Sequence, residues 1–218
     1  MNVSELADGD QVKKVLQAYA AYRTAVSKDP LSMAAPEARL PKAEVFYNSL
    51  TTAVVIILPE RHDSDVADVQ DCAEVVAKHV LLLKKVKIAV EEPVELSGGL
   101  LISNVGFAGD ITSKPATKSL FDFAPSARGS ISHQILARQI SSMLVGVKRF
   151  AAEAMPRNPR RYNNPEINET MAKNLNKNAG RGEAIVFPVG PDHLSASYDL
   201  NTLISHMTSM GWSSVGTV

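Results

Sequence analysis

The sequence predicts an α+β fold in which mixed helices accompany a small, mainly antiparallel sheet, with an N-terminal helical arm. Apolar residues recur at three- and four-residue spacing over 8–28 and 66–83, which is typical of helices buried on one face. The run Ala53–Leu58 is mostly β-branched and lacks alternation, which indicates a strand buried on both faces. Helical and strand segments follow one another irregularly, without the regular alternation of a doubly wound sheet.

Length and composition indicate a globular chain with a core of its own. The chain has 218 residues, of which 45% are hydrophobic and 21% charged. A single cysteine, Cys72, excludes an internal disulfide and a multi-cysteine zinc site. No apolar run approaches the ~18 residues of a membrane span, and the acidic first ten residues lack a secretory signal. We therefore expect no membrane partner, and a cytoplasmic protein or an intracellular particle.

The first 43 residues are predicted to form a helix and a connector. After the helix at 8–28, three prolines within 29–43 favour a stiff, exposed linker. We therefore divide the chain into an N-terminal helix and proline-rich linker, 1–43, and a single α+β domain, 44–218. The helix either exchanges between subunits as an arm or folds back on its own core.

An acidic stretch follows the first buried strand. Asp65, Asp68 and Asp71 are spaced so that they could converge on a cation, as in EF-hand loops, but the loop glycine and terminal glutamate are missing. We interpret Asp65 as the N-cap of the helix at 66–83, with the later acids favoured by the helix dipole. No metal site is therefore predicted.

The remaining elements are predicted from turns and periodicity. Strands at 86–90 and 100–107 are expected to form an antiparallel pair across a glycine turn, and a helix is expected from Ser130 or Ser132 to about Ala154.

The C-terminal part of the chain predicts three further elements. A short helix is closed by Gly180, a strand covers 184–189, and Tyr198 or Asp199 opens a last helix that ends at Gly211.

The strongest functional signal is a basic region at 148–181, which holds eight of the 23 basic residues and three acids. Arginine forks match phosphate geometry, lysines add point charge, and a tyrosine can stack on an unpaired base. Lys173 and Lys177 are four residues apart and share a helix face. The predicted nucleic-acid-binding residues are Lys148, Arg149, Arg157, Arg160, Arg161, Tyr162, Lys173, Lys177 and Arg181.

Charge is divided unevenly along the chain. Residues 1–110 carry 11 basic and 16 acidic groups, and residues 111–218 carry 12 and 7, although the net charge is zero. Unless the two halves mix in the fold, this favours head-to-tail packing of neighbouring molecules into rings or helical arrays. We therefore expect a self-assembling structural homo-oligomer of coat (capsid) or nucleoprotein type that binds single-stranded RNA or DNA non-specifically.

The alternative is a small soluble enzyme. Five histidines are scattered without ligand spacing, and Asp192 and His193 are neighbours in sequence only. No catalytic residue and no cofactor is predicted. A site could still assemble in space, because catalytic groups are recognised by geometry and not by their order in the chain.

Overall fold

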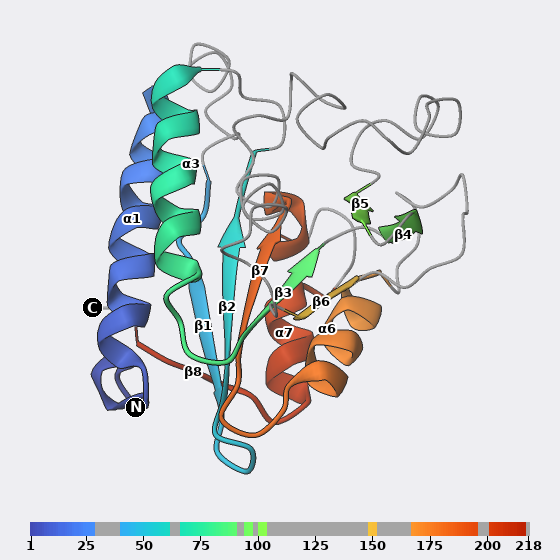
Figure 1. Ribbon diagram of the computed structural model, residues 1–218. Helices are drawn as coiled ribbons and strands as arrows, with labels where there is room; N and C mark the ends of the chain where they lie inside the picture. Colours follow the sequence, from blue (N-terminus) through green and yellow to red (C-terminus); the bar gives the residue numbers. More distant parts are fainter. Residues whose placement is uncertain are drawn as a thin grey trace.

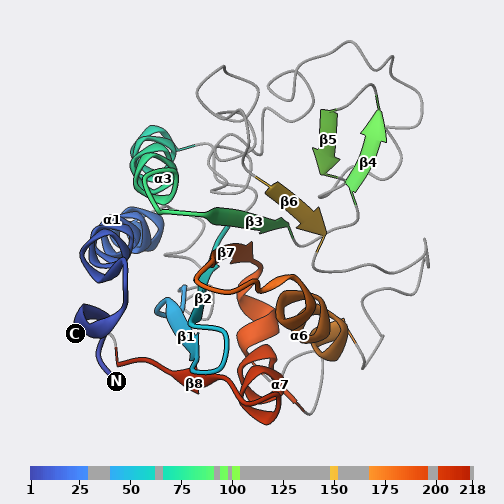
Figure 2. The same ribbon diagram turned by 60° about the horizontal axis from the view of Figure 1, so that its bottom comes forward.

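A six-stranded mixed sheet with helices on both faces forms the centre of the computed structural model (Figures 1 and 2). The structure describes residues 1–28, 40–61, 66–90, 94–97, 100–103, 148–151, 167–195 and 201–216. The combination of helices with a mixed sheet confirms the predicted α+β class.

Four neighbouring strands of this sheet are parallel and two at one edge are antiparallel. The expectation of a mainly antiparallel sheet is therefore wrong, since helical crossovers return the chain to the same edge of the sheet. The strand order is β6 (Lys148–Ala151), β3 (Val86–Val90), β7 (Ala184–Val189), β2 (Ala53–Pro59), β1 (Glu44–Asn48) and β8 (Ser213–Ser214).

Strand pairing corrects two further predictions. The strand β3 lies between β6 and β7, and the antiparallel hairpin is instead β4 (Val94–Ser97) with β5 (Leu100–Ser103). Residues 148–151 form a strand and not the end of a helix, because they pair in register with β3 at the sheet edge. Tertiary pairing overrides the helical periodicity of this segment. The predicted helix up to residue 147 lies outside the described residues.

One face of the sheet is covered by α1 (Gly9–Lys28) and α3 (Ala67–Val80). A short 3-10 turn, η1 (Val3–Glu5), precedes α1. Tyr22 and Val76 pack here with Ile56 and Val186 of the sheet. The N-terminal helix is thus folded back on its own chain's core. Residues 29–39 of the connector lie outside the described residues, so the domain boundary at residue 43 stays a prediction.

The other face is covered by α6 (Ile167–Asn178) and α7 (Leu203–Ser209). Their buried side chains pack with Phe187 and with Trp212, whose indole N–H donates to Asn176 Oδ1 at 3.0 Å. The last helix begins later than predicted, because Thr202 is its N-cap and accepts from the backbone N–H of Ser205 at 3.2 Å. Gly211 follows α7 with φ of 85°, the left-handed conformation typical of a helix C-terminus.

The N-cap position of α3 is Val66, whose side chain caps nothing, and Asp65 lies outside the described residues. None of the helices in the described part of the chain is both long and apolar enough to cross a membrane.

Successive side chains of the central strands point to opposite faces of the sheet, so both helical layers pack against the same strands. On β2, Ile56 and Leu58 face the α1/α3 layer, whereas Val55 and Ile57 face the α6/α7 layer. All four side chains are fully buried, which confirms the strand predicted to be buried on both faces.

The apolar seam of α3 gives a stability prediction. Val76 is fully buried and Val75, its neighbour on the same helix, is 44% exposed. Val76→Asp places an unpaired carboxylate in the core, so we expect it to lower the free energy of unfolding by about 3 kcal/mol or more. Val75→Asp is the matched control and should change it by less than about 1 kcal/mol. Urea unfolding followed by circular dichroism measures both, and equal effects would contradict the packing of α3.

Candidate functional site at the carboxyl ends of the parallel strands

The adjacent parallel strands β2 and β7 end at the same edge of the sheet. Beyond β2 the chain continues to α3 on one face, and beyond β7 it continues to α7 on the other (Figure 1). Such a divergence is a topological switch point, where open α/β sheets bind ligands outside the carboxyl ends of their strands. The candidate site therefore consists of the residues that follow these two strands.

Glu60 immediately follows β2 and is fully buried. Its backbone N–H donates to Val189 O at 2.9 Å, which extends the β2–β7 ladder by one residue past the end of β2. A buried carboxylate is costly to desolvate and is found where structure or chemistry requires it. The ladder therefore fixes an acid at the switch point.

Two tyrosines of α1 hold the chain as it leaves β2. The Tyr19 hydroxyl donates to Pro59 O at 2.8 Å, and the Tyr22 hydroxyl accepts from the Arg61 N–H at 3.1 Å. Burial raises the pKa of Tyr19 well above its usual range, and the nearby Tyr22 and Glu60 raise it further. The Tyr19 phenol therefore remains a hydrogen-bond donor, and Glu60 is held between two anchored neighbours.

His193 is positioned just beyond β7 on a 3-10 turn, η7 (Pro191–Leu194), and is only 5% exposed. Its Nδ1 lies 2.7 Å from Oδ1 of the buried Asn168 in the first turn of α6. Because the Asn168 amide nitrogen donates to Asn201 O at 3.2 Å, its oxygen is the atom directed at the ring. An amide oxygen only accepts, so Nδ1 carries the proton and Nε2 of the neutral ring is the basic nitrogen.

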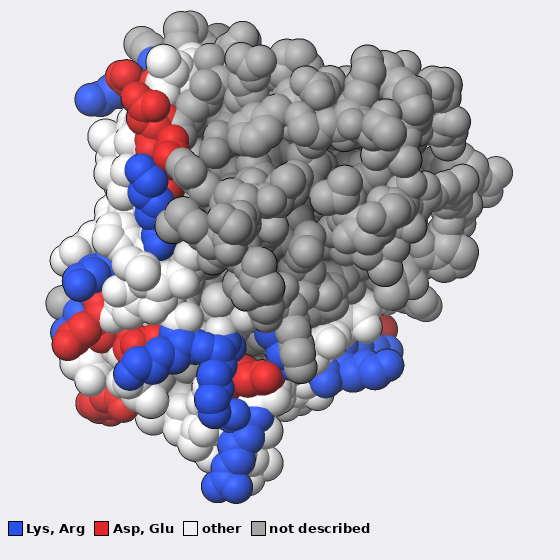
Figure 3. Space-filling model, viewed as in Figure 1, with Lys and Arg blue, Asp and Glu red and all other residues white. Residues whose placement is uncertain are grey.

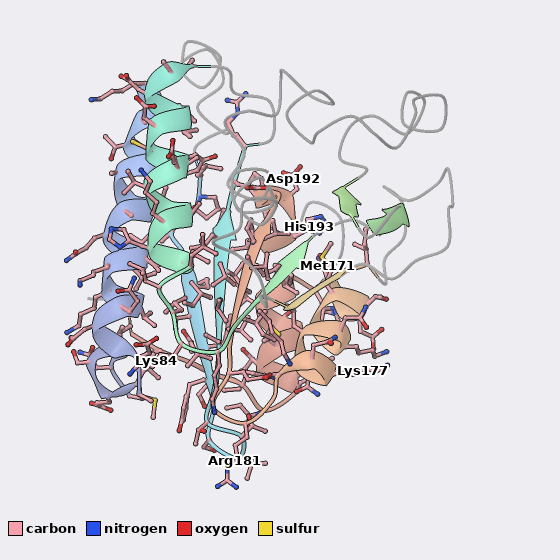
Figure 4. The ribbon with its side chains drawn as sticks, viewed as in Figure 1. Lys84, Met171, Lys177, Arg181, Asp192 and His193 are labelled. Atoms are coloured by element: carbon pink, nitrogen blue, oxygen red, sulfur yellow. The ribbon has the colours of Figure 1, made fainter. Side chains whose placement is uncertain are left out.

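The arrangement thus offers a carboxylate and an oriented imidazole at the ends of two adjacent strands. His193 and Asp192 lie toward the upper end of the sheet in Figure 4, and Asp192 is exposed. A buried acid, and a histidine whose neutral ring has one preferred tautomer, are groups that general acid–base chemistry uses. Sequence reasoning missed Glu60 as a site residue, and the available signal was its place directly after a buried strand.

The structure places only part of the predicted nucleic-acid site. Lys173 and Lys177 are both exposed on α6, which confirms their shared face, and Arg181 is exposed in the turn that follows. Lys173 pairs with Glu169 at 2.7 Å.

The other predicted residues divide into two groups. Lys148 and Arg149 lie in β6, opposite Lys87 and Ile88 of β3. The residues outside the described part of the chain are Arg157, Arg160, Arg161 and Tyr162.

Within the described residues, neither Asp68 and Asp71 of the acidic stretch nor Cys72 adds a second site. Over the described ranges, no group of three or more His, Cys, Asp or Glu residues could hold a metal ion. Burial raises the pKa of the Cys72 thiol, and Asp68 and Asp71 raise it further. A thiol in this environment stays protonated and is a poor nucleophile.

Comparisons of the chain with protein-family models, curated proteins and solved structures found no match. The assignment of function therefore rests on the geometry of the chain itself.

The histidine tautomer is directly testable. In its neutral form, we expect the His193 ring to carry its proton on Nδ1, which ¹⁵N chemical shifts of the imidazole nitrogens measure. In Asn168→Ala the acceptor is lost and the proton should redistribute toward Nε2. We also expect this variant to lose about 1–3 kcal/mol of stability, because a buried donor is left unpaired. A parent protein with its proton on Nε2 would contradict the assignment.

Proposed function

We propose that this protein is an enzyme that binds a small substrate at the carboxyl ends of β2 and β7 and acts on it by general acid–base catalysis. The observation that carries the proposal is the pair of buried titratable side chains, Glu60 and His193, directly beyond two adjacent parallel strands that diverge to opposite faces. Buried titratable groups at a switch point are a recurring feature of active sites.

The two groups have complementary roles in this proposal. The Asn168 contact places the proton of the neutral His193 ring on Nδ1. Nε2 is then the nitrogen that can accept a proton. Glu60 is the second titratable group, held by the β2–β7 ladder on one side and by the tyrosine contacts of α1 on the other. Positioning of both groups before substrate binds is what efficient proton transfer requires.

The proposal predicts loss of turnover in two conservative variants. A panel of chromogenic p-nitrophenyl esters, phosphates and glycosides and peptide anilides supplies the substrates. For whichever compound the parent turns over, His193→Gln and Glu60→Gln should each lower kcat/KM by about 10²-fold or more. The loss is expected because each change removes a proton-transfer group while keeping the side chain's approximate size.

The controls separate chemistry from folding. Glu74→Gln changes a carboxylate of α3 that pairs with Lys78, and it should leave kcat/KM within about twofold. Urea unfolding shows whether each variant keeps the parent's fold. If no compound in the panel is turned over, or if both site variants retain full turnover, the enzyme proposal is wrong.

A nucleoprotein function remains the second candidate, favoured by the exposed cations Lys177 and Arg181 along one side of α6 and its following turn. Neither makes an ion pair within the described residues.

Head-to-tail assembly gains no such support from the helical layers. The helices α1 and α3 carry five basic and four acidic residues, and α6 and α7 carry two and one, so each layer has the same small positive charge.

Salt dependence tests this second candidate. If the basic region binds a mixed-sequence single-stranded 20-mer, log K should fall with log salt at a slope of about −3 to −4. Arg160→Ala with Arg161→Ala should flatten that slope by about one to two, because fewer counterions are released. Tyr162→Ala should weaken binding by about 1–3 kcal/mol without changing the slope. Filter binding at several salt concentrations measures all three, and binding that ignores these substitutions would exclude the basic region.

A further inference from the structure

Three turns meet at the end of the sheet opposite the candidate active site. They are the β1–β2 turn at 49–52, the α3–β3 turn at 81–85 and the α6–β7 turn at 179–183. Backbone bonds join them: Gly182 N–H donates to Thr51 O at 2.9 Å, and Ala184 N–H donates to Lys85 O at 3.4 Å. Residues from distant parts of the sequence therefore share one surface.

Cations gather on this end of the molecule. The side chains of Lys84, Lys85, Lys177 and Arg181 are exposed, and none makes an ion pair with another described residue. Figure 3 shows Lys and Arg side chains, with Asp and Glu side chains among them, over the lower part of this view, and Figure 4 labels Lys84 and Arg181 there.

Two carboxylates near these cations are already engaged. Asp8 Oδ2 accepts from the Lys84 backbone N–H at 2.8 Å. Glu183 pairs with the half-buried Lys87 and accepts from the Gly180 N–H at 2.8 Å. The exposed ammonium and guanidinium groups therefore keep their charge available to a partner.

The same turns expose two leucines. Leu50 is 89% exposed and Leu82 is 65% exposed. Leu50 sits on a fixed turn, since Asn48 Oδ1 accepts from the backbone N–H groups of Leu50 and Thr51 at 3.0 and 3.2 Å. Leu50 adjoins Thr51, and Arg181 adjoins the Gly182 that bonds to it, so an apolar and a basic side chain lie at one tip.

We infer that this end of the molecule, formed by Leu50, Leu82, Lys84, Lys85, Lys177 and Arg181, docks on an anionic lipid bilayer. Basic side chains are attracted to anionic headgroups within a Debye length of the surface, and apolar side chains beside them enter the boundary with the acyl chains. Leucines on fixed, exposed turns gain nothing from a phosphate backbone in water, which is why a bilayer is favoured over a nucleic acid.

The geometry gives this docking a defined orientation. Glu60 and His193 lie beyond the carboxyl ends of β2 and β7, whereas the basic turns lie at the amino ends of β3 and β7. Docking through the turns therefore leaves the carboxyl ends of β2 and β7 facing away from the membrane. The surface includes neither Glu60 nor His193, and it shares Lys177 and Arg181 with the predicted basic region at 148–181.

Vesicle sedimentation tests the inference with the full chain. We expect binding to phosphatidylcholine vesicles that contain about one third phosphatidylserine, little binding to phosphatidylcholine alone, and loss of binding in about 0.5 M salt. Lys84→Ala with Lys85→Asn should lower the partition coefficient about 30-fold, since two interfacial charges are removed. Asparagine is chosen because Lys85 has φ of 48°, a conformation that asparagine tolerates. Leu50→Ser should lower the coefficient about tenfold.

The control variants remove the same kinds of exposed side chain at positions that lie off this surface. Lys28→Ala removes an exposed cation at the end of α1 farthest from Asp8, and Val75→Ser removes an exposed apolar side chain. Both should bind vesicles as the parent does. The inference fails if anionic vesicles do not bind the parent, if the controls lose binding equally, or if Lys84 and Lys85 are needed only for binding a single-stranded 20-mer. Melting temperatures confirm that each variant is folded.

Discussion

The parallel ladder between β2 and β7 is the constraint on which the rest of the structure depends. Its six register pairs bury side chains alternately toward α1/α3 and toward α6/α7, so neither helical layer has a core without it. Strands that are buried on both faces have no face left for polar side chains. Polar chemistry is therefore displaced to the two ends of the ladder, where Glu60 and His193 follow it and the basic turns precede it.

The two ends differ in how their polar groups are held. At the carboxyl ends, Asn168 and Tyr19 hold buried groups through directional hydrogen bonds. At the amino ends, Lys84 and Arg181 are exposed and are fixed only through the backbone of their turns. Directional, buried contacts suit selection of a small substrate, whereas exposed cations on long side chains suit a broad charged surface that tolerates variation in the position of its partner.

Periodicity alone could predict the elements that bury one face or two. The seam of α3 and the β-branched run of β2 were readable because each residue's environment repeats along the chain. Pairing partners were not readable, since Lys148–Ala151 has helical spacing yet completes an edge of the sheet. The site was beyond sequence reasoning for the same reason. Glu60 and His193 are brought to one edge by crossovers, and the tautomer of His193 depends on Asn168 and Asn201 from other elements.

The hydrogen bonds of Tyr19 and Tyr22 to the end of β2 make α1 part of the site as well as part of the core. Local unfolding that detaches this helix would release Pro59 and Arg61 at the same moment, so the order of the Glu60 segment is conditional on helix docking. The fraction of molecules with an ordered Glu60 segment would then follow the docking equilibrium of α1. Were the helix supplied by a neighbouring subunit, each site would be built from two chains, and dilution would act as an inhibitor.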